Sequence, residues 1–177
     1  MHSFAPEGEG RHASCGSLLE FSSAPPQTRM LLYADSSTTV LLEALVVDRL
    51  KVQVEQQILV RADDFPDIGC GLLGAAPSAM VVDRKSRILT ADHDVISVNR
   101  VIIAGPDRDS LVPADGELLG PHLRNIGLVM QRKPLAAARD IWPVDGMECG
   151  SKTYVIDCRP AGRVYVHERF NPQFIPL

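Results

Sequence analysis

Two kinds of apolar segment are missing from the sequence: a secretory signal and a membrane span. The first residues have no basic start followed by an apolar core, which is the pattern of a signal peptide. No apolar run among the 177 residues is long enough to cross a bilayer. We therefore expect a cytoplasmic protein with no membrane partner.

Nothing in the sequence marks a surface for nucleic acid. The formal net charge is −4, and there is no long run of charges of one sign. The three tyrosines, Tyr33, Tyr154 and Tyr165, are too widely scattered to form a platform on which bases stack. These absences argue against a nucleic-acid partner.

Cysteines at metal-binding spacing are also missing. The four cysteines, Cys15, Cys70, Cys149 and Cys158, include no CxxC pair, so a zinc site is not predicted. Because there is no export signal, we expect them to be reduced structural thiols in the cytoplasm.

A core large enough for one domain is present. Hydrophobic residues make up 45% of the chain, which suffices for a folded domain of this length. Residues 1–26 are rich in Gly, Ser, Pro and His and have few large apolar groups, which predicts a flexible leader. We expect residues 27–177 to form a single domain.

The predicted elements are mainly strands. One short helix should begin near Ser36 or Ser37, because good N-cap residues there precede apolar residues at helical spacing. Residues 62–80 hold Pro and Gly without a clear period, which predicts a long functional loop, for example a lid. Residues 125–141 are predicted to be partly helical. Strands are predicted at residues 49–60, 94–105, 110–119, 152–158 and 163–170, the last two as a hairpin.

This order of elements predicts an α+β fold. Nothing in it alternates like the βαβ units of a parallel sheet. We therefore expect an antiparallel sheet with at least two helices packed on it, in one domain and without an internal repeat.

Two charged side chains fall on apolar strand faces. In residues 163–170, Glu168 shares its alternating face with valines and a phenylalanine. In residues 96–104, Arg100 shares its face with two isoleucines, a valine and an alanine. An isolated buried charge is costly, so each side chain needs a partner or a ligand.

Two interpretations of these charges stay open. Arg100 and Glu168 could pair with each other or with backbone groups, or a bent strand could carry either charge to an edge. Alternatively, they line a pocket in which Arg100 holds an anionic group through its planar guanidinium and Glu168 exchanges a proton. The predicted helix start near Ser37 would add free backbone amides, which also favour anions. The second interpretation points to a small carboxylic acid as the ligand.

Five segments, taken in order, resemble the chorismate lyases (4-hydroxybenzoate synthases). They are "LLYADSSTTVLLEAL", "NRVIIAGPDRDSLVPADGELL", "RNIGLVM", "SKTYVI" and "GRVYVHERFNP", and the resemblance covers roughly residues 30–172. It implies a highly curved antiparallel sheet whose helices close over an internal ligand site. It also implies conversion of chorismate to 4-hydroxybenzoate and pyruvate, with neither metal nor organic cofactor.

The resemblance also implies roles for individual residues. Glu168 would be the catalytic glutamate that assists proton transfer, and Arg100 would hold the ring carboxylate. The other substrate-binding positions that it implies are Ser36, Ser37 and Thr38 at the helix start, Ala114 in the pocket wall and Lys152 at the enolpyruvyl carboxylate. Ser37 replaces a larger apolar residue, so the pocket wall is more polar than is usual in the family.

Other functions remain possible on the same fold. The substrate could be a chorismate analogue, such as aminodeoxychorismate or isochorismate, or the chain could bind small aromatic acids without converting them. The architecture also resembles the effector-sensing domain of some bacterial transcription regulators, which usually carry a helix-turn-helix domain first. Residues 1–26 are too short and too rich in Gly and Pro for such a domain, which argues against a regulator and leaves a stand-alone carrier open. The sequence leaves open whether the chain is a monomer or a homodimer.

Overall fold

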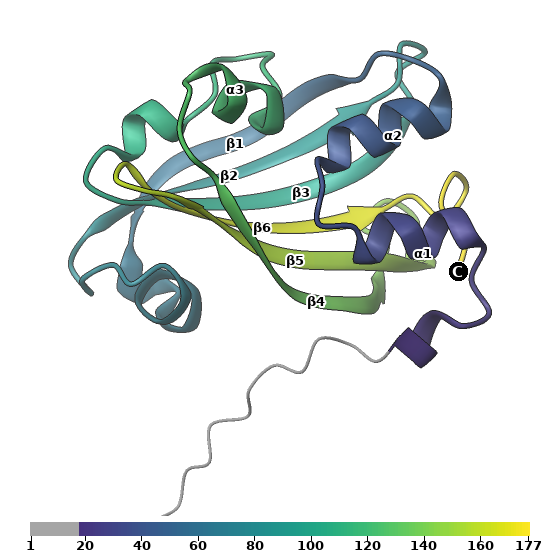
Figure 1. Ribbon diagram of the computed structural model, residues 1–177, viewed down its shortest axis with the longest axis horizontal. Helices are drawn as coiled ribbons and strands as arrows, with labels where there is room; N and C mark the ends of the chain where they lie inside the picture. Colours follow the sequence, from purple (N-terminus) through teal and green to yellow (C-terminus); the bar gives the residue numbers. More distant parts are fainter. Residues whose placement is uncertain (1–17) are drawn as a thin grey trace, which may run out of the picture.

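Six antiparallel strands form one sheet in the computed structural model, which describes residues 18–177 (Figure 1). Their order across the sheet is β1-β2-β3-β6-β5-β4, so two three-stranded meanders meet where β3 pairs with β6. The predicted α+β fold on an antiparallel sheet is confirmed. The strands are β1 (Lys51–Arg61), β2 (Met80–Leu89), β3 (Val95–Ala104), β4 (Gln131–Ile141), β5 (Glu148–Cys158) and β6 (Gly162–Phe170).

Three α-helices lie on one face of this sheet, which we call the helix face (Figure 1). They are α1 (Pro26–Tyr33), α2 (Thr38–Val46) and α3 (Leu119–Asn125). Ser37 is the N-cap of α2 and has extended backbone angles, which confirms the predicted helix start. None of the helices within residues 18–177 is both long and apolar enough to cross a membrane.

The core has two apolar clusters on the helix face and one on the opposite face, which we call the far face. The first cluster packs α1 and α2 around Phe170, and the second packs α3 around Val166. The third cluster lies under residues 62–75 and includes Ile102. Because the central strands are covered on both faces, they carry apolar residues on both faces.

Some elements differ from the sequence predictions. The segment 62–80 is not an irregular loop, because it contains a 3-10 turn at Ala62–Asp64 and a π-helical segment at Asp67–Leu72. Strand β2 was not predicted at all. Residues 110–119 are not a strand, and residues 125–141 are mostly β4 instead of helix. Pro134 suggested a helix boundary, but it lies at a bulge in an edge strand, where a missing N–H is tolerated.

Packed structure begins before the predicted boundary at residue 27. Residues 1–17 of the predicted leader lie outside the described residues. In the part that is described, Leu18–Phe21 form a 3-10 turn, and the Phe21 ring is fully buried against Tyr33, with 6.2 Å between ring centroids. Residues 18–26 therefore belong to the folded core.

The end of the chain closes against its first α-helix. The Thr28 hydroxyl on α1 donates to the Pro176 carbonyl at 2.8 Å, and the C-terminus lies beside α1 (Figure 1). The fold is thus tied together by contacts between residues that are far apart in the sequence.

Candidate ligand-binding site

A row of four buried polar side chains crosses the helix face of the sheet. Ser86, Asn99, Glu168 and Lys152 are successive cross-strand partners on β2, β3, β6 and β5. Each keeps 8% or less of its surface exposed. Burying polar groups in a row among apolar neighbours is costly unless they have partners or serve a ligand. This row is therefore the first indication of a functional site.

Glu168 lies under the first turn of α2. The Thr38 hydroxyl donates to Oε2 of Glu168 at 2.8 Å. Burial and the nearby Glu168 charge both raise the pKa of the Tyr154 phenol, which therefore stays protonated. Burial lowers the pKa of the Lys152 amine and Glu168 opposes that shift, while Nζ of Lys152 donates to the Leu31 carbonyl at 3.1 Å. The carboxylate thus sits among hydroxyl groups and one cation.

Arg84 supplies a buried cation one row further along β2. It is 3% exposed, and its Nη1 donates to Gln57 Oε1 at 2.6 Å and to the Pro113 carbonyl at 3.0 Å. Its Nη2 is buried and has no hydrogen-bond partner among the described residues. Burial lowers the pKa of the guanidinium, and the charges of Asp115 and Glu117 oppose the shift. A buried guanidinium N–H without an acceptor is suited to binding an anionic group.

A cavity joins Arg84, Glu168 and the start of α2. We call it the Glu168 cavity, and its free space is about 50 Å³. Ser37, Thr38 and Thr39 line it at the start of the helix, where backbone amides have no partner within the helix. The Ser37 hydroxyl is buried and also has no hydrogen-bond partner among the described residues. Guanidinium, hydroxyl and helix start therefore offer donors to the same small space.

A second cavity adjoins the first. It has about 130 Å³ of free space, and we call it the Lys152 cavity. Tyr154 and Arg132 line both cavities. Most of the other walls are apolar, with Lys152 and Ser36 among the polar exceptions: Leu32, Tyr33, Ala34, Pro134, Ala136 and Ala137.

Five of the seven predicted site residues lie at these two cavities. The first is lined by Ser37, Thr38 and Glu168, and the second by Ser36 and Lys152. Their placement matches the expected pocket, while their roles toward a ligand stay predictions.

Arg100 does not lie in this pocket, so the prediction that it shares the space with Glu168 is corrected. The direct partner of Glu168 on β3 is Asn99, whereas Arg100 lies opposite His167 on the far face. There its guanidinium makes two hydrogen bonds of 3.0 Å to the Asp83 carboxylate and lies 4.3 Å from the centre of the Phe65 ring. Because β3 is covered on both faces, alternation alone could not identify the pocket side.

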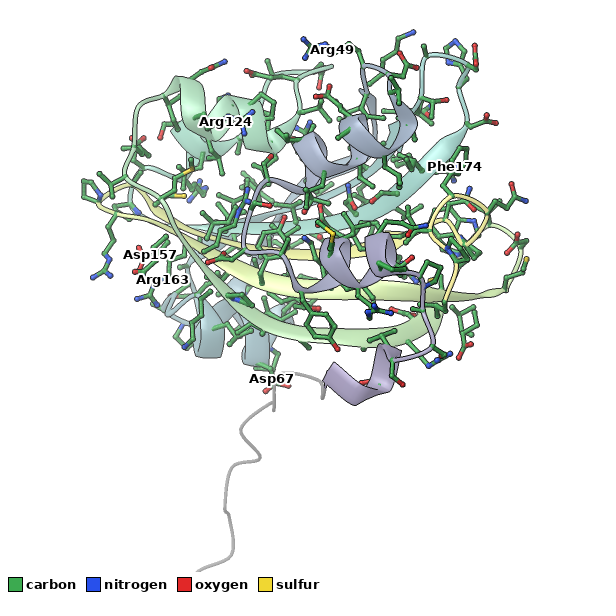
Figure 2. All side chains as sticks on the ribbon, turned by 45° about the vertical axis from the view of Figure 1, so that its right-hand side comes forward. Arg49, Asp67, Arg124, Asp157, Arg163 and Phe174 are labelled. Carbon is green, nitrogen blue, oxygen red and sulfur yellow. The ribbon has the colours of Figure 1, made fainter. Side chains whose placement is uncertain are left out.

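Ala114 and the segment 62–80 also lie away from the cavities. Ala114 is exposed in the loop before α3 and lines neither cavity. The segment 62–80 packs on the far face against Ile102, so it is not a lid over the Glu168 cavity. Figure 2 shows its Asp67 on the other side of the sheet from Arg124 of α3.

Arg84 and Arg132 are the cavity residues that the sequence interpretation missed. A usable signal was present for Arg84, because Val82, Arg84, Ser86 and Ile88 alternate along β2 on one face. The same reasoning that singled out Arg100 would have singled out Arg84. Within residues 18–177, no three His, Cys, Asp or Glu side chains gather closely enough to hold a metal ion.

His167 lies on the far face, as predicted, with its Nε2 3.2 Å from the Asp140 carboxylate. Burial lowers its pKa below 6.5, and Asp140 partly opposes the shift. The unfolded chain therefore binds this proton more readily, so acidification below about pH 6.5 should reduce stability. We expect His167→Gln to lose less unfolding free energy than the original protein between about pH 7 and pH 5.5. Urea denaturation at both pH values measures this, and equal losses would contradict the assignment.

Comparison with known proteins gives matches in structure only. No protein-family model and no curated protein sequence matches this chain. PhnF from Mycobacterium smegmatis superimposes with a TM-score of 0.60 at 10% identity, over 81% of this chain and 67% of PhnF. Its effector domain alone gives a TM-score of 0.59 at 11% identity, over 77% of this chain and 89% of that domain.

Two further solved structures superimpose on the chain. The C-terminal domain of the histidine utilization repressor from Pseudomonas syringae pv. tomato str. DC3000 gives a TM-score of 0.56 at 9% identity, over 73% of this chain and 96% of that domain. The ligand-binding domain of a putative GntR-family transcriptional regulator from Bordetella bronchiseptica gives 0.52 at 11% identity, over 70% and 83%.

These similarities define the fold as that of the effector domains of GntR-family regulators. The resemblance to the chorismate lyases therefore holds for the architecture of the sheet and its helices. The prediction of an enzyme, a chorismate lyase, is corrected, because the solved structures with this fold are transcriptional regulators and their ligand-binding domains. The argument from the short leader against a regulator loses its force, since an effector domain matches without any preceding domain.

Proposed function

We propose that the chain is a non-catalytic binding domain for a small organic acid, whose carboxylate lies against Arg84 and the start of α2. The observation that carries this proposal is the buried Nη2 of Arg84, which has no acceptor among the described residues. A buried donor without a partner costs free energy in the empty protein. An anionic ligand would remove that cost, so the site favours anions over neutral molecules of the same shape.

The rest of the cavity restricts what the acid carries at its other end. Glu168 accepts from Thr38 through one oxygen, so a hydroxyl or amine group of a ligand could donate to its other oxygen. The adjoining Lys152 cavity has mainly apolar walls that suit a ring or an aliphatic chain. Together these features favour a small aromatic acid with a polar substituent.

The fold supports binding rather than conversion. The Bordetella protein is a ligand-binding domain and the matching part of PhnF is an effector domain. We propose that this chain uses its helix-covered cavity in the same general way, to hold a small molecule whose presence changes the domain. Fold similarity alone does not assign a ligand, so the ligand class proposed here rests on the side chains of the site.

Benzoate should bind, and benzamide should bind at least about tenfold more weakly, because the amide has the same shape without the charge that pairs with Arg84. Calorimetric titration of the folded protein with both compounds measures the difference. Mass spectrometry should recover the bound acid unchanged after incubation. Equal affinity for the acid and the amide would contradict the proposed site, and chemical conversion of the acid would contradict a purely binding role.

A further inference from the structure

Neither cavity alone has room for the proposed ligand. The Glu168 cavity, which contains the Arg84 donor, has about 50 Å³ of free space. The Lys152 cavity has about 130 Å³. An apolar cavity of about 150 Å³ is the size that admits benzene. A ring bearing a carboxylate at Arg84 therefore needs both spaces together.

The partition between the two cavities is made by two side chains, Arg132 and Tyr154, which line both. Tyr154 is held firmly, because it is buried in the second core cluster. Arg132 is held weakly. Its Cζ lies 5.6 Å from the centre of the Tyr154 ring, and it makes no hydrogen bond or ion pair to any other residue in the described range 18–177. A single cation–π contact at a partly exposed site contributes little.

The backbone around Arg132 also permits movement of its side chain. Arg132 lies on β4, at the edge of the sheet, next to the bulge between Pro134 and Ala136. Rotation of its side chain breaks no strand pairing. Arg132 is therefore the part of the partition that can move without disturbing the core.

Outside the partition lies an open groove that Arg132 also lines. Arg124 and Met130 form part of this groove, and Ser37 belongs both to it and to the Glu168 cavity. Figure 2 shows Arg124 on α3, on the side of the molecule where α2 lies. Two arginines at this mouth attract an approaching carboxylate. That carboxylate gives Arg132 a stronger partner than the Tyr154 ring and draws its guanidinium outward.

We infer that Arg132 is a gate: stacked on Tyr154 it separates the two cavities, and turned outward it joins them into the single space that the ligand occupies. This inference rests on the proposed function, because it concerns the same site. It has two consequences. A ring-bearing acid must wait for the gate to open, whereas an acid as small as acetate fits the Glu168 cavity with the gate closed.

The test is stopped-flow binding, which the fluorescence of the single tryptophan and the tyrosines can report. The observed rate with benzoate should level off as its concentration rises, because gate opening becomes limiting, while the rate with acetate should rise without a plateau. Arg132→Ala should abolish the plateau and raise the benzoate rate at high concentration by about tenfold or more. Melting curves of each variant confirm that it is folded.

Arg124→Ala is the matched control, because it removes a positive charge from the same groove without touching the partition. It should slow benzoate association a few-fold at low salt and keep the plateau. If benzoate binds but its rate never levels off, or if Arg132→Ala behaves like Arg124→Ala, the gate is wrong and the proposed function stands. If neither benzoate nor acetate binds the original protein, both are wrong.

Discussion

Arg84→Met should weaken benzoate binding about 100-fold and leave the domain folded. A hydrogen bond to a charged group contributes about 1.5–3 kcal/mol, and about 2.8 kcal/mol corresponds to a factor of 100 in affinity. Arg84 is expected to supply a contact of this kind, because its Nη2 is buried and unpaired among the described residues. Methionine has a similar length and removes only the charge and the donors. Calorimetric titration measures the loss.

The stability of Arg84→Met separates binding from folding. The variant loses the donors to Gln57 and to the Pro113 carbonyl, but it also removes a cation whose burial lowers its pKa. These effects oppose each other, so we expect the unfolding free energy to change by only about 1 kcal/mol. Retained benzoate affinity in a folded Arg84→Met protein would overturn the proposed site.

Arg100→Met should give the opposite pair of results. Benzoate affinity should stay unchanged, because Arg100 lies on the far face. The unfolding free energy should fall by about 2 kcal/mol, since the Asp83 carboxylate, only 4% exposed, loses its partner. This value lies below the usual cost of breaking a buried pair because the Arg100 side chain is 32% exposed. Urea denaturation and calorimetry measure the two results.

A second substitution tests the reason for that loss. Asp83→Asn combined with Arg100→Met removes both charges of the pair and should restore most of the lost stability. If the double variant is as unstable as Arg100→Met, the cost comes from lost packing on Phe65 and not from an unpaired charge. If Arg100→Met weakens benzoate binding as strongly as Arg84→Met, the assignment of the two arginines to opposite faces of the sheet has no functional meaning.

The elements that the sequence predicted well are those with one dominant signal. The helix start at Ser37 has N-cap residues directly before an apolar run, and the hairpin of β5 and β6 has clear alternation on both sides of its turn. Strand β2 has no such signal. Its centre, from Asp83 to Arg87, is entirely polar, because Arg84 and Ser86 face the cavity while its other polar residues face the opposite side.

The site was predicted in part for a similar reason. Glu168 stands alone as a charge among apolar residues on its strand face, so its burial could be inferred. Arg100 shows the same pattern, yet the pairing register that puts Asn99 opposite Glu168 is a property of two strands and cannot be seen in one. The resemblance to the lyases gave the fold correctly and the activity incorrectly, because one fold serves proteins of different function.

The bond between Thr38 and Glu168 spans 130 residues of chain and lies in the wall of the ligand cavity. The site is therefore complete only when the final strand has joined the sheet, and a truncated or nascent chain that lacks β6 has no place for the acid. Occupancy reports on the whole molecule, and by mass action a ligand at 100 times its dissociation constant adds about 2.7 kcal/mol to global stability. Slower amide hydrogen exchange should then appear together in α2 and β6, at opposite ends of the sequence.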